Sequence, residues 1–432
     1  MNTGQRARCD HVAHHLDRVV LHDAQLHHAR ARSLLLRQMR DEYRDEFRFC
    51  HPEAPPGTEE LFIAGLGGAL YYFWPMLNVA VRSARTVVVH SPRLASDLVE
   101  WFPEQMVESI RMGVADPFPA LSAGLAEPPA AGERSRGSRG ARSSSDPPAP
   151  LTFAAFGLVT PEKRISVILR ALASTVAYHS EVRLMLVGDT ADYYDALAEA
   201  RELGVGDRVT VTGYVSEDKL PEYLQQADVC LCLRWPTGRE TSASWLRCLA
   251  AGKPTVVTDL VHTVDVAALD PRTWTVQDAS AGVPPEFSPH DDERDAPTPE
   301  SRFPNPASPG SRSPNPVPVC VAIDILDEEH SLKVAMRRLA TDARLRQQLG
   351  HAARAYWQRH HRIEHMARDY DRVFRRVAQI QSKADRDLPR HLLRDGTELL
   401  HEILRGVGLE LPLGEAEASR LPLLGRPAQE SH

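Results

Sequence analysis

The chain has 432 residues, of which 42% are hydrophobic and 25% are charged, and its formal net charge at pH 7 is −7. This length suffices for two domains that each bury a core, and the composition is typical of a soluble globular protein. The negative balance argues against nonspecific nucleic-acid binding, which needs a basic surface. The six cysteines form no CxxC pair and lack zinc-ligand spacing. We therefore predict no metal site, no cofactor and a cytoplasmic location, in keeping with polar first residues unlike a signal peptide.

The first 120 residues alternate between short apolar runs and helical patterns. Strands are expected at 18–21 and 86–90, and helices at 32–47 and 92–101. These are too few strands for a complete α/β domain, so residues 1–120 predict an incomplete Rossmann-like domain.

An uncharged stretch of about twenty residues at 61–81 is long enough to cross a bilayer. However, it contains three glycines, Pro75 and Asn78, and no basic residues flank it in the pattern of a membrane span. We predict a buried loop and helix in a soluble core.

Two segments, 121–150 and 278–318, are rich in Ser, Arg, Gly and Pro and have almost nothing to bury. The first is interpreted as a disordered interdomain linker and the second as a disordered insertion. The basic run at 133–145 could contact RNA, but a solvated linker is the favoured interpretation.

Between these segments, apolar runs alternate regularly with helical patterns. Strands are expected at 152–156, 183–187, 208–212, 229–233 and 254–258, with helices at 161–177, 192–203, 218–226 and 242–251. Such alternation predicts βαβ units and a doubly wound parallel sheet. With a further strand at 319–323 and long helices from 328 to about 379, a complete domain is expected at 151–375. Helices and a tail follow at 376–432.

The first motif, GLVTPEKR at 157–164, closes the first strand of this sheet. Thr160 is a plausible N-cap and Pro161 suits the first position of a helix. The helix amides would then face the carboxyl edge of the sheet and form an anion site, with positive charge from Lys163 or Arg164. A diphosphate could be held there without a metal. The alternative is an ordinary solvated Lys–Arg pair.

The second motif is RWPTGRETSASWLRCLAAGKP at 234–254. Glu240 lies in a glycine-containing loop, Thr241 or Ser242 caps the next helix, and Gly252 ends it. A carboxylate at this place could accept hydrogen bonds from sugar hydroxyls while the helix amides bind phosphate. The alternative is a surface glutamate ahead of an amphipathic helix.

Together with 187–189, 212–215 and 227–228, these motifs resemble in order and spacing the family 4 retaining glycosyltransferases, which have the two-domain GT-B fold. The resemblance covers 151–276 and 319–375. It implies that Lys163 contacts the donor diphosphate. It also implies that a Glu-x7-Glu element contacts the transferred sugar and the ribose.

The sequence departs from that family at two positions. Leu158 replaces the usual arginine after the first glycine, and Arg247 occupies the place of the second glutamate. A Gly-x-Glu-Thr-Ser variant with Arg234 ahead of it resembles a bacterial subgroup, so Glu240 is the preferred sugar contact. The segment that precedes the His-Asp strand in the family is missing here, so we expect a truncated N-terminal domain or a misassigned start.

The same subgroup resemblance concerns a third motif, VVLHDAQLHH at 19–28. It implies that His22 and Asp23, at the end of a strand, face the interdomain cleft and orient donor or acceptor hydroxyls. The alternative is a strand-end histidine satisfied by the backbone. The six histidines within 1–28 match no zinc geometry.

The resemblance therefore implies transfer of a sugar, with retention, from a UDP- or GDP-sugar to a glycan, lipid-linked or small-molecule acceptor in cell-surface polysaccharide or glycoconjugate synthesis. Peripheral membrane association is compatible with it, and nucleic acid is not an expected partner. The alternatives are a catalytically degenerate nucleotide-sugar-binding or scaffolding paralogue, or another sugar-nucleotide enzyme such as an epimerase. The candidate catalytic residues are Glu240, His22 and Asp23, and the candidate donor-binding residues are Gly157, Lys163, Arg164, Gly188, Arg234, Thr241, Ser242 and Arg247.

Overall fold

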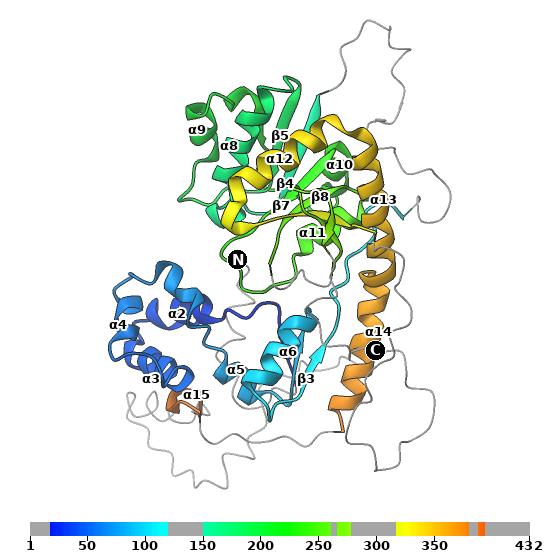
Figure 1. The fold of residues 1–432 in the computed structure, drawn as a ribbon. Helices are drawn as coiled ribbons and strands as arrows, with labels where there is room; N and C mark the ends of the chain where they lie inside the picture. The colour runs from blue at the N-terminus through cyan, green and yellow to red at the C-terminus, as the bar shows by residue number, and fades with distance from the viewer. Residues whose placement is uncertain (1–17, 120–149, 261–265, 278–316, 380–387, 394–432) are drawn as a thin grey trace, which may run out of the picture. The chain divides into compact units, whose positions relative to one another are not determined.

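The computed structural model describes residues 18–119, 150–260, 266–277, 317–379 and 388–393 (Figure 1). These residues fall into two compact units. The helical unit comprises residues 18–19, 25–86 and 388–393, and the sheet unit comprises 20–24 and the described residues from 87 to 379. The predicted linker, nearly all of the predicted insertion and most of the predicted C-terminal segment lie outside the described residues.

The helical unit is built on aromatic side chains. Tyr43, Phe47 and Phe62 are buried in its core, and the Nε2 atom of His27 lies 2.7 Å from the Tyr43 hydroxyl oxygen. Burial lowers the pKa of His27 to about 3, so this imidazole is neutral at pH 7. The helices are α2 (His27–Leu35), α3 (Arg40–Cys50), α4 (Thr58–Ile63), α5 (Asn78–Ser83) and α15 (Arg390–Leu393), with a 3₁₀ turn at Gly68–Tyr72.

Two expectations for this region meet different outcomes. The single helix predicted at 32–47 is wrong: α2 and α3 are separate, because the chain turns at Gln38, whose φ is +61°. The uncharged stretch at 61–81 contains only short helical pieces. The expectation that it is buried holds only in part, because Phe62 and Met76 lie in the core whereas Leu66 and Phe73 are exposed. No helix of the described residues is long and apolar enough to cross a membrane.

The sheet unit contains an eight-stranded sheet with the order β10-β9-β11-β8-β7-β4-β5-β6. Every neighbouring pair is parallel except β10 and β9. The strands are β4 (Leu151–Phe156), β5 (Val182–Val187), β6 (Val209–Val211), β7 (Val229–Cys232), β8 (Thr255–Thr258), β9 (Ala268–Leu269), β10 (Val276–Gln277) and β11 (Cys320–Ile323).

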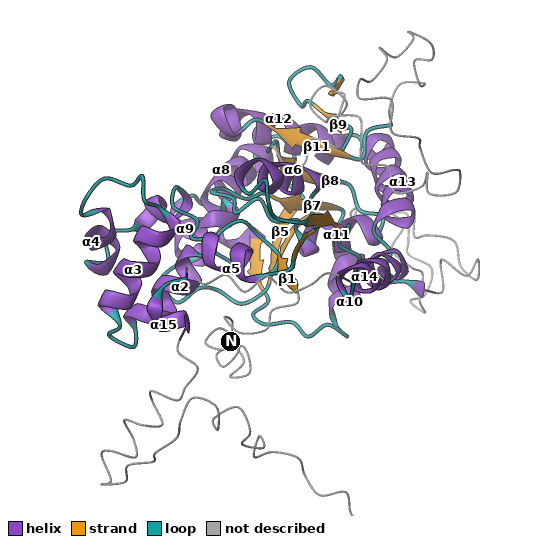
Figure 2. Cartoon of the chain, turned by 90° about the horizontal axis from the view of Figure 1, so that it is seen from below, coloured by secondary structure: helices purple, strands orange, loops and turns teal. Residues whose placement is uncertain are grey.

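Helices cover both faces of this sheet (Figure 2). The central strand β4 shows why: Phe153 and Ala155 join the core beneath α8 and α12, whereas Ala154 and Phe156 join the core beneath α10 and α11. A strand buried on both faces needs apolar residues at every position. The predicted α/β class with a doubly wound, Rossmann-like sheet is confirmed. The helices are α8 (Ile165–Val176), α9 (Ala196–Glu202), α10 (Leu220–Gln226), α11 (Ala243–Ala250), α12 (Glu328–Thr341), α13 (Ala343–His360) and α14 (Ile363–Val377).

A second, three-stranded sheet has the order β1-β2-β3, with strands Arg18–Leu21, Thr86–Val89 and Val107–Ser109. Val88 of this sheet packs with Ile110 and with Val373 and Val377 of α14. Residues 87–119, including α6 (Pro92–Trp101), therefore belong to the same compact unit as the large sheet. This division differs from the predicted domain at 1–120, because the apolar face of α14 supplies the core under the small sheet.

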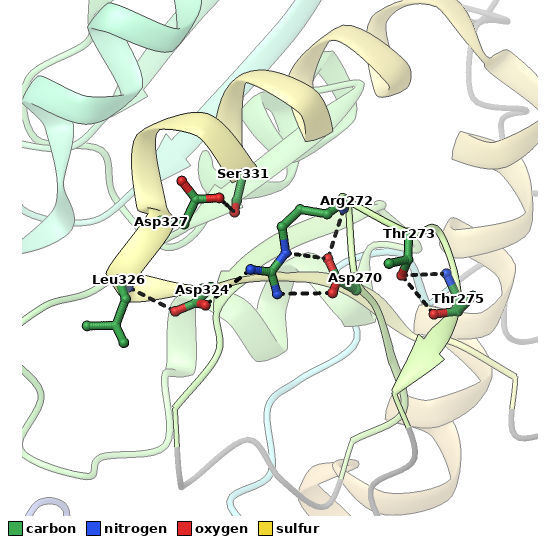
Figure 3. Close-up of polar contacts among 8 residues, drawn as sticks. All are labelled: Asp270, Arg272, Thr273, Thr275, Asp324, Leu326, Asp327 and Ser331. Atoms are coloured by element: carbon green, nitrogen blue, oxygen red, sulfur yellow. Dashed lines mark hydrogen bonds and ion pairs between the residues drawn. The ribbon is translucent and has the colours of Figure 1, made fainter.

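A polar network closes the ends of β9 and β11 (Figure 3). The guanidinium of Arg272 donates to both carboxylate oxygens of Asp270, each at 3.1 Å, and to Asp324 at 3.3 Å. Asp324 in turn accepts from the backbone N–H of Leu326 at 2.9 Å. The paired guanidinium lowers the pKa of Asp270 and so favours its ionised form.

Candidate functional site

The sequence order of the large sheet reverses between β4 and β7. Strands β5 and β6 follow β4 on one side, while β8 and β11 follow β7 on the other. In an open parallel sheet, the loops that leave the carboxyl ends of the two strands at such a switch point diverge and leave a crevice. Both main motifs, 157–164 and 234–242, leave the sheet at this point.

Gly157 and Gly188 allow two chain segments to approach each other closely. Gly157 has a φ of +91° and Gly188 a φ of +150°. A Cβ on Gly188 would lie 2.3 Å from the Gly157 carbonyl oxygen, and a Cβ on Gly157 would lie 2.5 Å from the Nζ of Lys163. Neither position therefore accepts a larger residue without a shift of the site.

Lys163 reaches back to the end of the strand that precedes it. Its ammonium donates to the carbonyl oxygen of Phe156 and lines a cavity of about 70 Å³, the lysine cavity, together with Arg234 and Glu240. Burial, with a smaller contribution from the nearby Arg234 charge, lowers the pKa of Lys163 to about 8. Because burial disfavours the charged form of this amine, an anionic ligand in the cavity would stabilise the charge, and Lys163 is suited to bind one.

The local structure around Lys163 corrects the expected start of the helix. Residues Pro161–Lys163 form a 3₁₀ turn, and α8 begins at Ile165 rather than at Pro161. The cause is Arg164, which adopts a left-handed conformation with a φ of +59° and interrupts the helix. The predicted role of Thr160 as the N-cap is not seen, because its side chain makes no capping hydrogen bond.

Arg164 lies in a different environment from the one its motif suggested. Its guanidinium holds the carboxylate of Glu328 at distances of 2.6 to 2.9 Å and so joins the start of α8 to the start of α12. The Glu328 side chain is 6% exposed, and Arg164 is not among the residues that line the lysine cavity. The structure therefore assigns Arg164 to a buried ion pair and does not bring it together with the other donor-binding candidates.

Glu240 is held by its own loop. Its Oε2 accepts hydrogen bonds from the backbone N–H of Gly238 at 2.8 Å and from the Thr237 hydroxyl at 3.1 Å. Its Oε1 forms an ion pair with the Nε of Arg234. The carboxylate is 14% exposed, so it is fixed and desolvated at the wall of the lysine cavity.

The neighbouring candidates Thr241 and Ser242 have different roles. Ser242 caps α11, because its Oγ accepts from the backbone N–H of Trp245 at 3.3 Å. The Thr241 hydroxyl instead donates to the carbonyl oxygen of His90 at 3.2 Å. Both residues line the lysine cavity. Of the two caps that the sequence left open, Ser242 is therefore the one observed.

Arg247 lies between two further cavities. The glycine cavity, of about 260 Å³, is lined by Gly157, Gly188, Tyr214 and Arg247 among others. The histidine cavity, of about 710 Å³, is lined by His22, His90 and Tyr370 and also by Arg247. The guanidinium of Arg247 donates to both carboxylate oxygens of Glu217, at 2.8 and 3.0 Å, and Glu217 lines both cavities. This exposed ion pair thus marks the boundary between them.

The His-Asp motif lies beside the loop that carries Glu240. The rings of His22 and His90 have centroids 5.0 Å apart. The N–H of Ala24 donates to the carbonyl oxygen of Gly238 at 2.6 Å, and a Cβ on Gly238 would lie 3.1 Å from the Cβ of Asp23. The structure therefore brings both candidate residues of this motif to the second loop.

Sequence reasoning missed three residues around this loop. His90 is buried, and its Nδ1–H donates to the Ile110 carbonyl oxygen at 2.9 Å. Asp97 and Trp101 contact Arg239. His90 follows a strand directly, as His22 does, and that position was the available signal. Nothing local in the sequence indicated Asp97 or Trp101, because their partner lies far along the chain.

Residues 150–281 match the family described as glycosyl transferases group 1. No curated protein matches the chain. Solved structures similar to it include a sucrose-phosphate synthase from Thermosynechococcus elongatus, with 16% identity, a TM-score of 0.47, 74% of this chain covered and 65% of that chain. HepE from Anabaena, in complex with UDP and glucose, has 12% identity, a TM-score of 0.46, and 71% and 66% coverage. A TarM variant from S. aureus has 10% identity, a TM-score of 0.47, and 71% and 46% coverage.

The chain thus spans 46% to 66% of the length of these three structures. The family match begins at the strand β4 and includes both main motifs. Residues 150–281 therefore contain a glycosyl transferases group 1 domain, built on the parallel sheet described above.

Proposed function

We propose that the chain is a GT-B glycosyltransferase that transfers a sugar from a nucleoside-diphosphate sugar to an acceptor with retention. The observation that carries this proposal is the convergence of Lys163, Arg234 and Glu240 on one cavity at the switch point of the sheet. Two cationic groups beside a fixed carboxylate suit a ligand with an anionic part and a hydroxyl-rich part. A sugar diphosphate has both.

The three cavities suggest how the donor would be arranged. The diphosphate would contact Lys163 and Arg234, and the transferred sugar would donate hydroxyl hydrogen bonds to Glu240. The glycine cavity would hold the nucleoside, since it adjoins the lysine cavity through the shared residues Phe156 and Ser244. His22 and Asp23 would orient hydroxyls of the sugar or of the acceptor.

In the proposed reaction, the bond between the anomeric carbon and the diphosphate oxygen breaks, and the acceptor oxygen bonds to the same face of that carbon. The nucleoside diphosphate leaves with the bonding electrons, and its freed oxygen takes up the proton that the acceptor hydroxyl loses. Lys163 and Arg234 would stabilise the charge that develops on the diphosphate, which is electrostatic catalysis by preorganised groups. This scheme needs no cofactor beyond the donor, and it fits a cytoplasmic enzyme that extends a glycan, a lipid-linked sugar or a small molecule.

Two observations favour a second candidate function, a nucleotide-sugar-binding protein without turnover. Arg247 occupies the place of the second glutamate of the family and is paired with Glu217. Leu158, in the place of the usual arginine, is 53% exposed and brings no charge to the diphosphate. Binding without transfer would identify this case.

The test is calorimetric titration of the chain with UDP, GDP and their common sugar nucleotides, beside the variants Lys163→Ala and Glu240→Ala. We expect one nucleoside diphosphate to bind, Lys163→Ala to weaken it by about tenfold or more, and Glu240→Ala to remove the preference for the sugar-bearing form. Lys219→Ala and Glu202→Ala, both on exposed surfaces of the same unit, are matched controls that should bind as the wild type does.

If the folded wild-type protein binds neither nucleotide nor sugar nucleotide, the proposal is wrong. If it binds the donor, the anomeric configuration of the product, read by NMR with simple glycoside acceptors, tests retention. Inversion would contradict that part of the proposal.

A further inference from the structure

The loop that carries Glu240 contacts α6 and the ends of the small sheet through the residues that precede and follow Glu240. We call residues 237–241 the donor loop. The Gly238 carbonyl accepts from Ala24, the Arg239 guanidinium pairs with Asp97, and the Thr241 hydroxyl donates to His90. The Glu240 carboxylate turns toward Arg234 and the lysine cavity, which Thr241 also lines.

Arg239 is the residue of this loop whose backbone most needs support. Its φ is +64°, a conformation that a non-glycine residue rarely holds unless its contacts maintain it. Its backbone N–H donates to the Thr237 hydroxyl at 3.0 Å. The same hydroxyl donates to Glu240 at 3.1 Å, so the conformation of Arg239 and the place of the Glu240 carboxylate are coupled directly.

Asp97 gives the Arg239 side chain a fixed partner. Its carboxylate is 8% exposed and contacts Arg239, while Arg93 of the same helix lies 3.4 Å away. The guanidinium of Arg239 also lies over the ring of Trp101, 4.9 Å from its centroid. A carboxylate that is nearly buried requires a cationic partner, so the pairing holds Arg239 against α6.

We propose that Asp97 and Arg239 form a positioning pair that holds the donor loop in the conformation in which Glu240 faces the lysine cavity. The pair touches neither the donor nor the reacting atoms, and it acts through Glu240. This inference rests on the proposed function, because it assigns to the pair the sugar-dependent part of donor binding.

The experiment measures two dissociation constants for each variant, those of the nucleoside diphosphate and of its sugar nucleotide, with UDP and UDP-glucose and with GDP and GDP-mannose as probes. Asp97→Asn and Arg239→Gln should change the nucleoside diphosphate value by less than about twofold and weaken sugar-nucleotide binding by about tenfold, the effect of one charged hydrogen bond. Arg239→Lys and Asp97→Glu, which keep the charges, should recover part of that loss. Arg170→Gln, which breaks the exposed Arg170–Glu329 pair, is the matched control.

Because Asp97 is nearly buried and Arg239 is 40% exposed, Arg239→Gln carries the test if Asp97→Asn lowers the melting temperature strongly. Folded variants that bind the sugar nucleotide as tightly as the wild type would overturn the positioning pair and leave the proposed function intact. A parallel loss of nucleoside diphosphate and sugar nucleotide would also overturn it, because the pair would then support the site as a whole. A wild-type protein that binds neither probe set would overturn the proposed function and this inference together.

Discussion

Lys163 has the most informative chemistry of the single residues. Its ammonium is buried and lies near Arg234, which together lower its pKa to about 8, and it donates to the backbone carbonyl oxygen of Phe156. A diphosphate placed in the lysine cavity would reverse this balance, because an adjacent anion favours the charged amine. Lys163 therefore binds its proton weakly when no anion is present, and an anionic ligand would strengthen that binding.

A pH dependence of donor affinity follows. The folded lysine loses its proton as the pH rises through about 8, so nucleoside diphosphate should bind about tenfold more weakly at pH 9 than at pH 7. Calorimetry across this range measures the effect. In Lys163→Arg, the side chain stays charged, and the decline should disappear. A wild-type affinity that stays constant from pH 7 to pH 9 would contradict a role for the Lys163 charge.

The sequence identified the residue types of the site more reliably than their partners. The motif offered Lys163 and Arg164 alike as sources of positive charge for the donor, but the Arg164 guanidinium forms an ion pair with Glu328 instead. The reason is sequence distance: Arg164 and Glu328 are 164 positions apart, and no local pattern reveals such a pair.

At the scale of elements, the Arg164–Glu328 pair joins α8 to α12. These helices lie together on one face of the sheet (Figure 1), and their apolar residues share one core. Glu328 is 6% exposed, so its charge depends on Arg164 for compensation. The pair therefore links the first residues of the two helices.

Removal of Arg164 should affect stability rather than donor binding. Arg164→Ala leaves Glu328 buried without its guanidinium, and we expect a loss of about 3 kcal/mol in the free energy of unfolding, measured by urea denaturation. The same change at Arg170, whose pair with Glu329 is exposed, should cost less than about 1 kcal/mol. If Arg164→Ala keeps the wild-type stability but loses much of the nucleotide affinity, Arg164 belongs to the donor site instead.

Local sequence signals predict some of the strands and helices correctly and others not. The strands of the large sheet and α6 follow their apolar patterns and their caps, as with Ser91, which accepts from the N–H of Leu94. Two helix boundaries that the sequence misplaced, the break missed at residues 36–39 and the start expected at Pro161, are places where one residue adopts a left-handed backbone. Neither Gln38 nor Arg164 is a residue type that signals such a turn.

At the scale of the whole molecule, both compact units contain histidines that are buried in the neutral form. Burial lowers the pKa of His27 in the helical unit to about 3 and that of His361 in the sheet unit to about 4. The unfolded chain binds a proton at each of these residues near pH 6.5, whereas the folded chain does not. Protonation therefore favours unfolding, and the stability present above pH 6.5 is lost as the pH falls.

We expect the free energy of unfolding to decrease between pH 6.5 and pH 5 by about 1.4 kcal/mol per pH unit for each such histidine, in the unit that contains it. Urea denaturation at pH 7, 6 and 5 measures this slope. His27→Gln and His361→Gln should each flatten it, whereas His330→Gln, at an exposed position, should not. A stability that is constant or rises as the pH falls to 5 would contradict the neutral burial of these residues.

Taken alone, the sequence determined the α/β class, the doubly wound sheet and the place of both main motifs, because apolar periodicity and strand-end motifs are local properties of the chain. Only the tertiary structure decided which residues meet: Arg234 with Glu240 and Lys163 in one cavity, Arg164 with Glu328, and Arg239 with Asp97. It also placed residues 87–119 in the unit of the large sheet. The physical reason is that ion pairs and shared cores depend on where remote segments pack, and no periodicity within either segment records that packing.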